Sequence, residues 1–255
     1  FFNNYLVKSK KSYTPQNIGE LKNDYDLFIS GSDQVWSPRC VGFDPAYFLT
    51  FADDRQKYSY AASFAIPTLP DEFIDEYKKR LNGFQKFSVR EPSGEKLVKE
   101  LTGRTAETHL DPTLLISADE WKKIAVSKID KPYILIFTAN PAVSLVDFAL
   151  KLSKKKNLPV YCINDAPHPV SHGINYIVAP TVEEFVGCFK NAEYVVTNSF
   201  HGTAFSVIFN KNLFVEFKNK SGRNIRSEGL LKSLGIDREI VDGNCRETEI
   251  NWYDV

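Results

Sequence analysis

The feature that most constrains the fold is the alternation of short apolar segments with amphipathic ones. Segments 25–30, 133–137 and 194–197 are strand-sized and rich in β-branched and aromatic residues. Between such segments, stretches such as 70–81 and 143–154 carry apolar residues at helical spacing. Strands that alternate with helices along a chain predict an α/β fold with parallel sheets.

Capping and turn residues place the other expected elements. Pro92 opens a helix that Gly103 ends, and Thr181 with Glu184 predicts a capping box. The further expected strands are 57–63, 84–89, 108–110, 159–163, 174–178 and 213–217, and the further expected helices are 117–125, 181–189, 201–209 and 226–234.

The polar stretch 126–132 interrupts the alternation and is typical of a linker. We therefore expect two domains, residues 1–128 and residues 129–255. The 255 residues include no methionine, even at the first position, so we expect that the natural product is longer. On this interpretation the N-terminal domain is incomplete here and lacks a strand–helix unit.

Charge and composition exclude several classes of function. The 32 basic and 32 acidic residues balance, which gives no reason to expect a nucleic-acid partner. We expect no transmembrane segment, because the apolar runs are strand-sized, and the first residues do not have the pattern of a signal peptide. The four cysteines have no zinc-like spacing. We therefore expect a cytoplasmic protein with reduced, mostly buried thiols and no metal site.

The strongest candidate site is the strand-to-helix turn in residues 195–203, VVTNSFHGT. Ligands of open α/β sheets bind at the carboxyl ends of strands, and a helix N-terminus attracts anions. In this interpretation Ser199, Gly202 and Thr203 lie around an anion, and His201 donates to it or moves a proton. The alternative is a capped helix with a buried, satisfied histidine.

Two further segments place polar residues at strand ends. Arg90, in SVRE, follows a strand and suits bidentate contact with a phosphate or carboxylate, although an exposed Arg90–Glu91 pair is an alternative. Asp111, in an Asp-Pro turn, also ends a strand and can equally be structural. Both are candidates for one anion site.

The segment 31–36, GSDQVW, closes the first expected strand. Gly31, Ser32, Asp33 and Gln34 are candidate substrate-binding residues, and Trp36 offers either a face for sugar stacking or a buried pin for the turn. The motif alone leaves both interpretations open.

Five segments in this order resemble the polysaccharide pyruvyl transferase family. They are GSDQVW at 31–36, SYAASF at 59–64, SVRE at 88–91, LDPTLL at 110–115 and VVTNSFHGTAFSVIF at 195–209. The resemblance spans about residues 24–235. It implies two Rossmann-like lobes in a GT-B-like arrangement. The family's glycine-rich first strand-turn has no counterpart in this chain.

The resemblance also implies an activity. Members move the enolpyruvyl group of phosphoenolpyruvate onto a sugar of a polysaccharide, or of its lipid-linked precursor, as a pyruvate ketal, and they release phosphate. It implies no cofactor beyond phosphoenolpyruvate as the donor substrate. Carried over by motif, the family's histidine falls on His201 and its arginine on Arg90, both as candidate catalytic residues. Asp33 and Asp111 are candidates for contact with acceptor hydroxyls or for orienting the cations.

Two other functions remain open from the sequence. A GT-B glycosyltransferase would also present a helix N-terminus to phosphates, and Glu216 and Lys218 are loose candidates for its sugar-nucleotide site. A non-catalytic carbohydrate- or anion-binding homologue would keep the fold without turnover. The sequence does not specify the acceptor sugar, the ketal stereochemistry or the oligomeric state.

Overall fold

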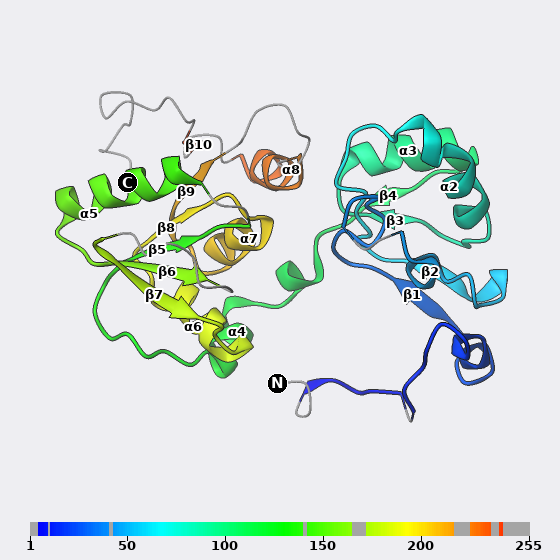
Figure 1. The fold of residues 1–255 in the computed structure, drawn as a ribbon, viewed down its shortest axis with the longest axis horizontal. Coiled ribbons are helices and arrows are strands. Elements are labelled where there is room, and N and C mark those ends of the chain that lie inside the picture. Colours follow the sequence, from blue (N-terminus) through cyan, green and yellow to red (C-terminus); the bar gives the residue numbers. More distant parts are fainter. Residues whose placement is uncertain are drawn as a thin grey trace. The chain divides into compact units, whose positions relative to one another are not determined.

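The computed structural model describes residues 5–9, 11–40, 43–139, 142–164, 172–216, 225–235 and 240–241 (Figure 1). The chain separates into two compact units. The N-terminal unit contains Val7–Leu115 and Ser221–Gly229, and the C-terminal unit contains Phe1–Leu6, Ile116–Lys220 and Leu230–Val255. The expected domain boundary between residues 128 and 129 stays a prediction.

The C-terminal unit is built on one six-stranded sheet in which the order is β10-β9-β8-β5-β6-β7. Its strands are β5 (Ile134–Phe137), β6 (Val160–Asn164), β7 (Ile174–Val178), β8 (Tyr194–Thr197), β9 (Asn212–Glu216) and β10 (Ile240–Val241). All of its strand pairs are parallel. In chain order this is the doubly wound Rossmann arrangement, with its switch point between β5 and β8.

Helices cover both faces of this sheet (Figure 1). The helices are α4 (Ala118–Ile124), α5 (Val143–Lys156), α6 (Val182–Asn191) and α7 (Phe200–Ile208), and α8 (Ile225–Ser233) is divided between the two units after Gly229. Leu145, Phe148 and Leu152 of α5 pack on one face, because the side chains of each strand alternate between faces. Phe189 of α6 and Phe205 of α7 pack on the other face. The result is a three-layer α/β/α unit.

The N-terminal unit has shorter parallel strands. They are β1 (Phe28–Ser30), β2 (Lys57–Ser59), β3 (Ser88–Val89) and β4 (Glu107–Thr108). β1 pairs with β2 and β3 with β4, and isolated parallel bridges join Tyr58 to Lys86 and Ala62 to Val89. The helices are α2 (Ile74–Leu81) and α3 (Pro92–Thr102), with 3-10 turns η1 (Ile18–Asn23), η2 (Pro45–Phe48), η3 (Asp54–Gln56), η4 (Asp71–Phe73) and η5 (Pro112–Leu115).

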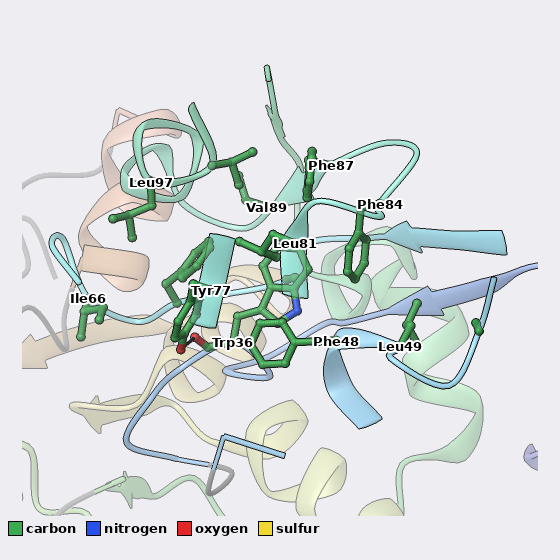
Figure 2. Packing of buried hydrophobic residues seen from close by; sticks show 14 residues of the cluster. Trp36, Phe48, Leu49, Ile66, Tyr77, Leu81, Phe84, Phe87, Val89 and Leu97 are labelled. Atoms are coloured by element: carbon green, nitrogen blue, oxygen red, sulfur yellow. Dashed lines mark hydrogen bonds between the residues drawn. The ribbon is translucent and has the colours of Figure 1, made fainter. Parts of the chain in front are cut away.

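An aromatic core holds the N-terminal unit together (Figure 2). Trp36 is fully buried, and its ring centroid lies 5.3 Å from that of Phe84 and 5.4 Å from that of Phe64. Its indole N–H donates to the carbonyl of Tyr47, and the Tyr77 hydroxyl donates to the carbonyl of Trp36. Trp36 is therefore a buried pin for the turn, and the interpretation as a sugar-stacking platform is wrong.

The α/β class with parallel sheets is confirmed, and most helix signals hold in detail. Gly103 ends α3 in the left-handed conformation, Ser117 caps α4, and Thr181 with Glu184 forms the capping box of α6. Strands of the N-terminal unit are shorter than the apolar segments that predicted them, and β10 was not expected. Among the helices of the described residues, none combines the length and apolarity that a membrane span requires.

Candidate functional site

A buried arginine forms the centre of a polar cluster in the N-terminal unit. Arg90 directly follows β3, and its side chain is only 2% exposed. The guanidinium donates through Nη1 to Asp111 Oδ2 at 2.5 Å and through Nη2 to Asp33 Oδ1 at 2.9 Å. Glu91 bonds elsewhere, so the alternative of an exposed Arg90–Glu91 pair is wrong.

Asp111 is the buried partner of Arg90. Its Oδ1 accepts from the Thr113 amide and hydroxyl at 3.0 and 2.8 Å, and its Oδ2 also accepts from the Ser32 hydroxyl at 2.9 Å. Burial alone would raise the pKa of this carboxyl, but the bonds from Thr113 and Arg90 hold it below its usual value. Breaking such a buried pair costs about 3–5 kcal/mol, so Asp111 fixes the guanidinium in place.

Asp33 contacts the same guanidinium from the solvent side. Its side chain is 58% exposed, and its Oδ1 also accepts from Arg226 Nη1 at 3.3 Å. An ion pair this exposed contributes about 0–1 kcal/mol. The Asp33 backbone lies in the left-handed region at φ 60°, which aspartate tolerates, and its carbonyl accepts from the Ser63 amide at 2.9 Å. The turn is therefore held by its backbone while its carboxylate stays accessible.

A second arginine joins this cluster from far along the chain. Arg226 lies in the first turn of α8, and its side chain is 10% exposed. With the Gln34 amide oriented to satisfy both groups, the Gln34 oxygen accepts from Arg226 Nη2 and from Nη1, the latter at 3.1 Å. Burial and the nearby positive charge of Arg90 lower the pKa of Arg226, while Asp33 opposes this.

Sequence reasoning did not find Arg226, which is separated from Asp33 by 193 positions. One signal was present, since a cation in the first turn of a helix opposes the helix dipole. The position of Arg226 in the first turn of the expected helix 226–234 therefore indicates that an anion compensates its charge, and Asp33 is such an anion.

Glu91, the residue after Arg90, holds the loop 63–65 through hydrogen bonds. Its Oε1 accepts from the Ser63 hydroxyl at 2.9 Å, the Phe64 amide at 3.0 Å and the Ala65 amide at 3.1 Å. Among the described residues, its Oε2 is buried with no hydrogen-bond partner. Burial raises the pKa of this carboxyl, and the bonds from Ala65 and Ser63 offset part of the rise. Glu91 therefore ties the SYAASF segment to the end of β3.

Gly31 and Ser32 complete the turn after β1. A Cβ at Gly31, where φ is 119°, would lie 2.2 Å from the Tyr60 carbonyl oxygen, so close strand approach requires a glycine. The Ser32 hydroxyl is 3.1 Å from the Ala61 carbonyl and 2.9 Å from Asp111 Oδ2. The structure thus brings Ser32, Asp33, Gln34, Arg90 and Asp111 together with Arg226, and their roles in binding a substrate stay a prediction.

The second candidate site is the turn between β8 and α7 in the C-terminal unit. β8 and β5 are neighbours, so this turn lies at the switch point, where open α/β sheets bind ligands. Ser199 caps α7: its hydroxyl accepts from the Gly202 amide at 3.4 Å, and its carbonyl accepts from the Thr203 amide at 3.0 Å. The Asn198 side chain accepts from the Ala139 amide at 2.9 Å, which joins the loops after β8 and β5.

Gly202 has a packing role that the sequence did not predict. A Cβ there would lie 2.2 Å from Thr197 Oγ1 and 3.2 Å from Phe137 Cδ1. The absence of a side chain at this position therefore allows close packing of α7 against Thr197 and Phe137, and the predicted role of Gly202 in substrate binding stays a prediction. Thr203 is likewise fully buried, and its hydroxyl donates to the Ser199 carbonyl at 3.0 Å.

His201 lies at the second position of α7 and is half-buried. Its ring contacts that of Phe200 with centroids 5.4 Å apart. His201 belongs to the C-terminal unit and Arg90 to the N-terminal unit. Their joint action on one ligand therefore stays a prediction.

Other candidates are less informative. Glu216, a residue considered for a sugar-nucleotide site, is buried at the end of β9 and accepts from the Ser144 hydroxyl, while Lys218 lies outside the described residues. No group of three or more potential metal ligands occurs among the residues that the structure describes. Cys162 and Cys188 are at least half-buried, as expected, whereas Cys40 is exposed.

Comparisons with known proteins identify the family. The family model described as polysaccharide pyruvyl transferase matches residues 1–215, so the chain belongs to this family. No curated protein sequence matches the chain. Among solved structures, the UDP-GlcNAc 2-epimerase of Methanocaldococcus jannaschii in complex with UDP-GlcNAc and UDP matches with 12% identity and a TM-score of 0.47. That match covers 86% of this chain and 71% of the epimerase.

Proposed function

We propose that this member of the polysaccharide pyruvyl transferase family transfers the enolpyruvyl group of phosphoenolpyruvate to a sugar as a pyruvate ketal. The observation that carries the proposal is the buried Arg90 guanidinium, fixed by the buried Asp111 on one side and paired with the exposed Asp33 on the other. Phosphoenolpyruvate carries a phosphate and a carboxylate, and a fixed guanidinium fork suits either group.

The proposed reaction consists of proton transfers and the replacement of one C–O bond to phosphate by two C–O bonds to the sugar. Protonation of the methylene carbon of phosphoenolpyruvate makes a methyl group and leaves a cation at the neighbouring carbon. Two hydroxyls of the sugar then form bonds to that carbon as its bond to the phosphate oxygen breaks. One hydroxyl proton replaces the proton delivered to the methylene carbon, and the other leaves with the phosphate.

The proposal gives each site residue a role. Arg90 neutralises the phosphate or carboxylate, and His201 contacts the phosphate and assists proton transfer, since histidine titrates in the useful pH range. The first-turn amides of α7 present the positive end of a helix dipole to an anion. Asp111 orients Arg90, while Ser32 and Gln34 lie at the edge of the site, where sugar hydroxyls can bond to them.

The test is turnover with phosphoenolpyruvate and a panel of acceptors that includes free sugars, oligosaccharides and lipid-linked glycans. Release of phosphate together with a pyruvylated product is expected for the wild-type protein. Arg90→Gln and His201→Ala should each reduce turnover by about 100-fold or more, the scale of losing a general acid or a fixed charge. Near-wild-type turnover in both variants would contradict the assignment.

A control separates the alternatives that the sequence left open. Calorimetric titration with UDP and GDP, beside phosphoenolpyruvate, distinguishes a nucleotide-sugar enzyme from the proposed one. Binding of a nucleoside diphosphate without binding of phosphoenolpyruvate would favour the glycosyltransferase. Tight binding of phosphoenolpyruvate without turnover across the panel would favour a binding homologue.

A further inference from the structure

We propose that Arg226 is a second anion-binding residue of the donor site, and that the incoming anion replaces the Asp33 carboxylate between Arg226 and Arg90. The inference rests on the proposed function for the identity of the donor, phosphoenolpyruvate. It goes beyond that function because Arg226 lies in none of the five segments that resemble the family.

The arrangement of charges supports this role. The Arg90 and Arg226 side chains are 2% and 10% exposed, and both donate to the same atom, Asp33 Oδ1. Burying two like charges close together is costly unless an anion lies between them. The lowered pKa of Arg226, caused by burial and then by Arg90, reports that cost. The pair of guanidinium groups thus forms a site whose chemistry selects an anion.

The two carboxylates at this site are held very differently. Asp111 is buried and accepts from Ser32, Thr113 and Arg90, so its displacement would leave several donors unsatisfied. Asp33 is 58% exposed, and the two arginines share its Oδ1. A ligand that arrives from solvent meets Asp33 first. The anion therefore displaces the Asp33 carboxylate from the two arginines, while Asp111 remains bonded to Arg90.

The geometry of the ligand group fits the exchange. A phosphate presents three oxygens and up to two negative charges, whereas Asp33 offers one charge and one shared oxygen to the two arginines. Each guanidinium can then bond a separate phosphate oxygen. In this mechanism Asp33 keeps the site neutral when it is empty and competes with the ligand.

The experiment is calorimetric titration of the full chain with inorganic phosphate and, separately, with phosphoenolpyruvate. Arg226→Gln should bind both anions about 10-fold to 100-fold more weakly, the effect of losing one charge-assisted contact. Asp33→Asn should bind them more tightly, by about 3-fold to 10-fold, because the competing charge is gone. Lys232→Gln removes an exposed charge from the last turn of the same helix and should leave both affinities unchanged.

Thermal unfolding confirms that each variant is folded, and Arg226→Lys provides a second variant that keeps the charge without the fork. Arg226→Lys should bind more tightly than Arg226→Gln and more weakly than the wild type. Affinities of folded Arg226→Gln within twofold of the wild type, or an equal loss in Lys232→Gln, would overturn the role of Arg226. Weaker binding by Asp33→Asn would overturn the displacement of Asp33.

The two anions distinguish failure of this inference from failure of the proposed function. Wild-type protein that binds phosphate but not phosphoenolpyruvate contradicts the proposed donor, while the Arg226 comparison still runs with phosphate. Wild-type protein that binds phosphoenolpyruvate as tightly as its Arg226→Gln variant contradicts only the Arg226 assignment. Wild-type protein that binds neither anion contradicts both.

Discussion

Substitution of Gly202 by alanine tests whether this glycine serves strand–helix packing. The new Cβ would lie 2.2 Å from Thr197 Oγ1 and 3.0 Å from Thr197 Cβ, both well inside van der Waals contact. Thr197 is fully buried, and its hydroxyl bonds the Phe137 carbonyl and, at 3.0 Å, the Ser199 amide. Relief therefore requires the threonine to rotate or α7 to move away from the sheet.

The expected cost follows from these contacts. Rotation of Thr197 loses two hydrogen bonds, each contributing about 1 kcal/mol. Residual overpacking adds about 1–3 kcal/mol, and the better helix propensity of alanine returns about 1 kcal/mol. We therefore expect Gly202→Ala to destabilise the C-terminal unit by about 2–4 kcal/mol. The matched control is Gly229→Ala in α8, where a Cβ meets no atom within 4 Å.

The assay is urea unfolding monitored by hydrogen–deuterium exchange of peptides from the C-terminal unit. This local readout is needed because two units need not unfold in one transition. Adding Thr197→Ala removes the hydroxyl that the new Cβ meets. The double variant should therefore be less destabilised than the two single variants together. A Gly202→Ala protein as stable as Gly229→Ala would refute the packing argument.

The remaining predictions concern protonation and thiol chemistry. Because burial raises the pKa of Glu91 from 4.5, its stabilising contribution is complete below pH 4.5 and is lost as pH rises through the raised value. As pH rises, the melting temperature of the wild-type protein should therefore fall relative to that of Glu91→Gln. A difference between the two that does not change with pH would contradict this. Burial raises the pKa of Cys162 and of Cys188 to about 11, whereas Cys40 is exposed. Mass spectrometry after alkylation of the folded protein at pH 8 should find Cys40 modified before Cys162 and Cys188, and modification of either buried thiol as fast as Cys40 would count against the burial.

Prediction from the sequence succeeded where the signal was local. The capping box of Thr181 and Glu184, and the left-handed Gly103, depend on residues only a few positions apart. The bounds of β7 and β8 also agree with the apolar segments. Arg90 directly follows β3, as expected, because the apolar strand that precedes it is a local pattern.

The parts that the sequence did not predict depend on distant packing. Nothing near Arg226 in the sequence indicates that Asp33 is its partner, because only the fold joins positions so far apart. The role of Gly202 depends on the Thr197 side chain, and a sequence pattern does not say which side of a glycine is filled. Trp36 was ambiguous for the same reason, since burial among Phe64 and Phe84 decides between a core residue and a stacking platform.

The polar cluster of the N-terminal unit is a costly way to stabilise a fold. The aromatic core around Trp36 already buries large apolar side chains without charges. Buried ion pairs can often be replaced by apolar groups of similar volume without loss of stability. The pair of Arg90 and Asp111 is therefore not needed for packing. What it adds to the unit is a guanidinium fixed in direction beside the exposed carboxylate of Asp33. Such preorganisation is what an anion-binding site requires, because the cost of orienting the charge is met during folding and not when the ligand binds.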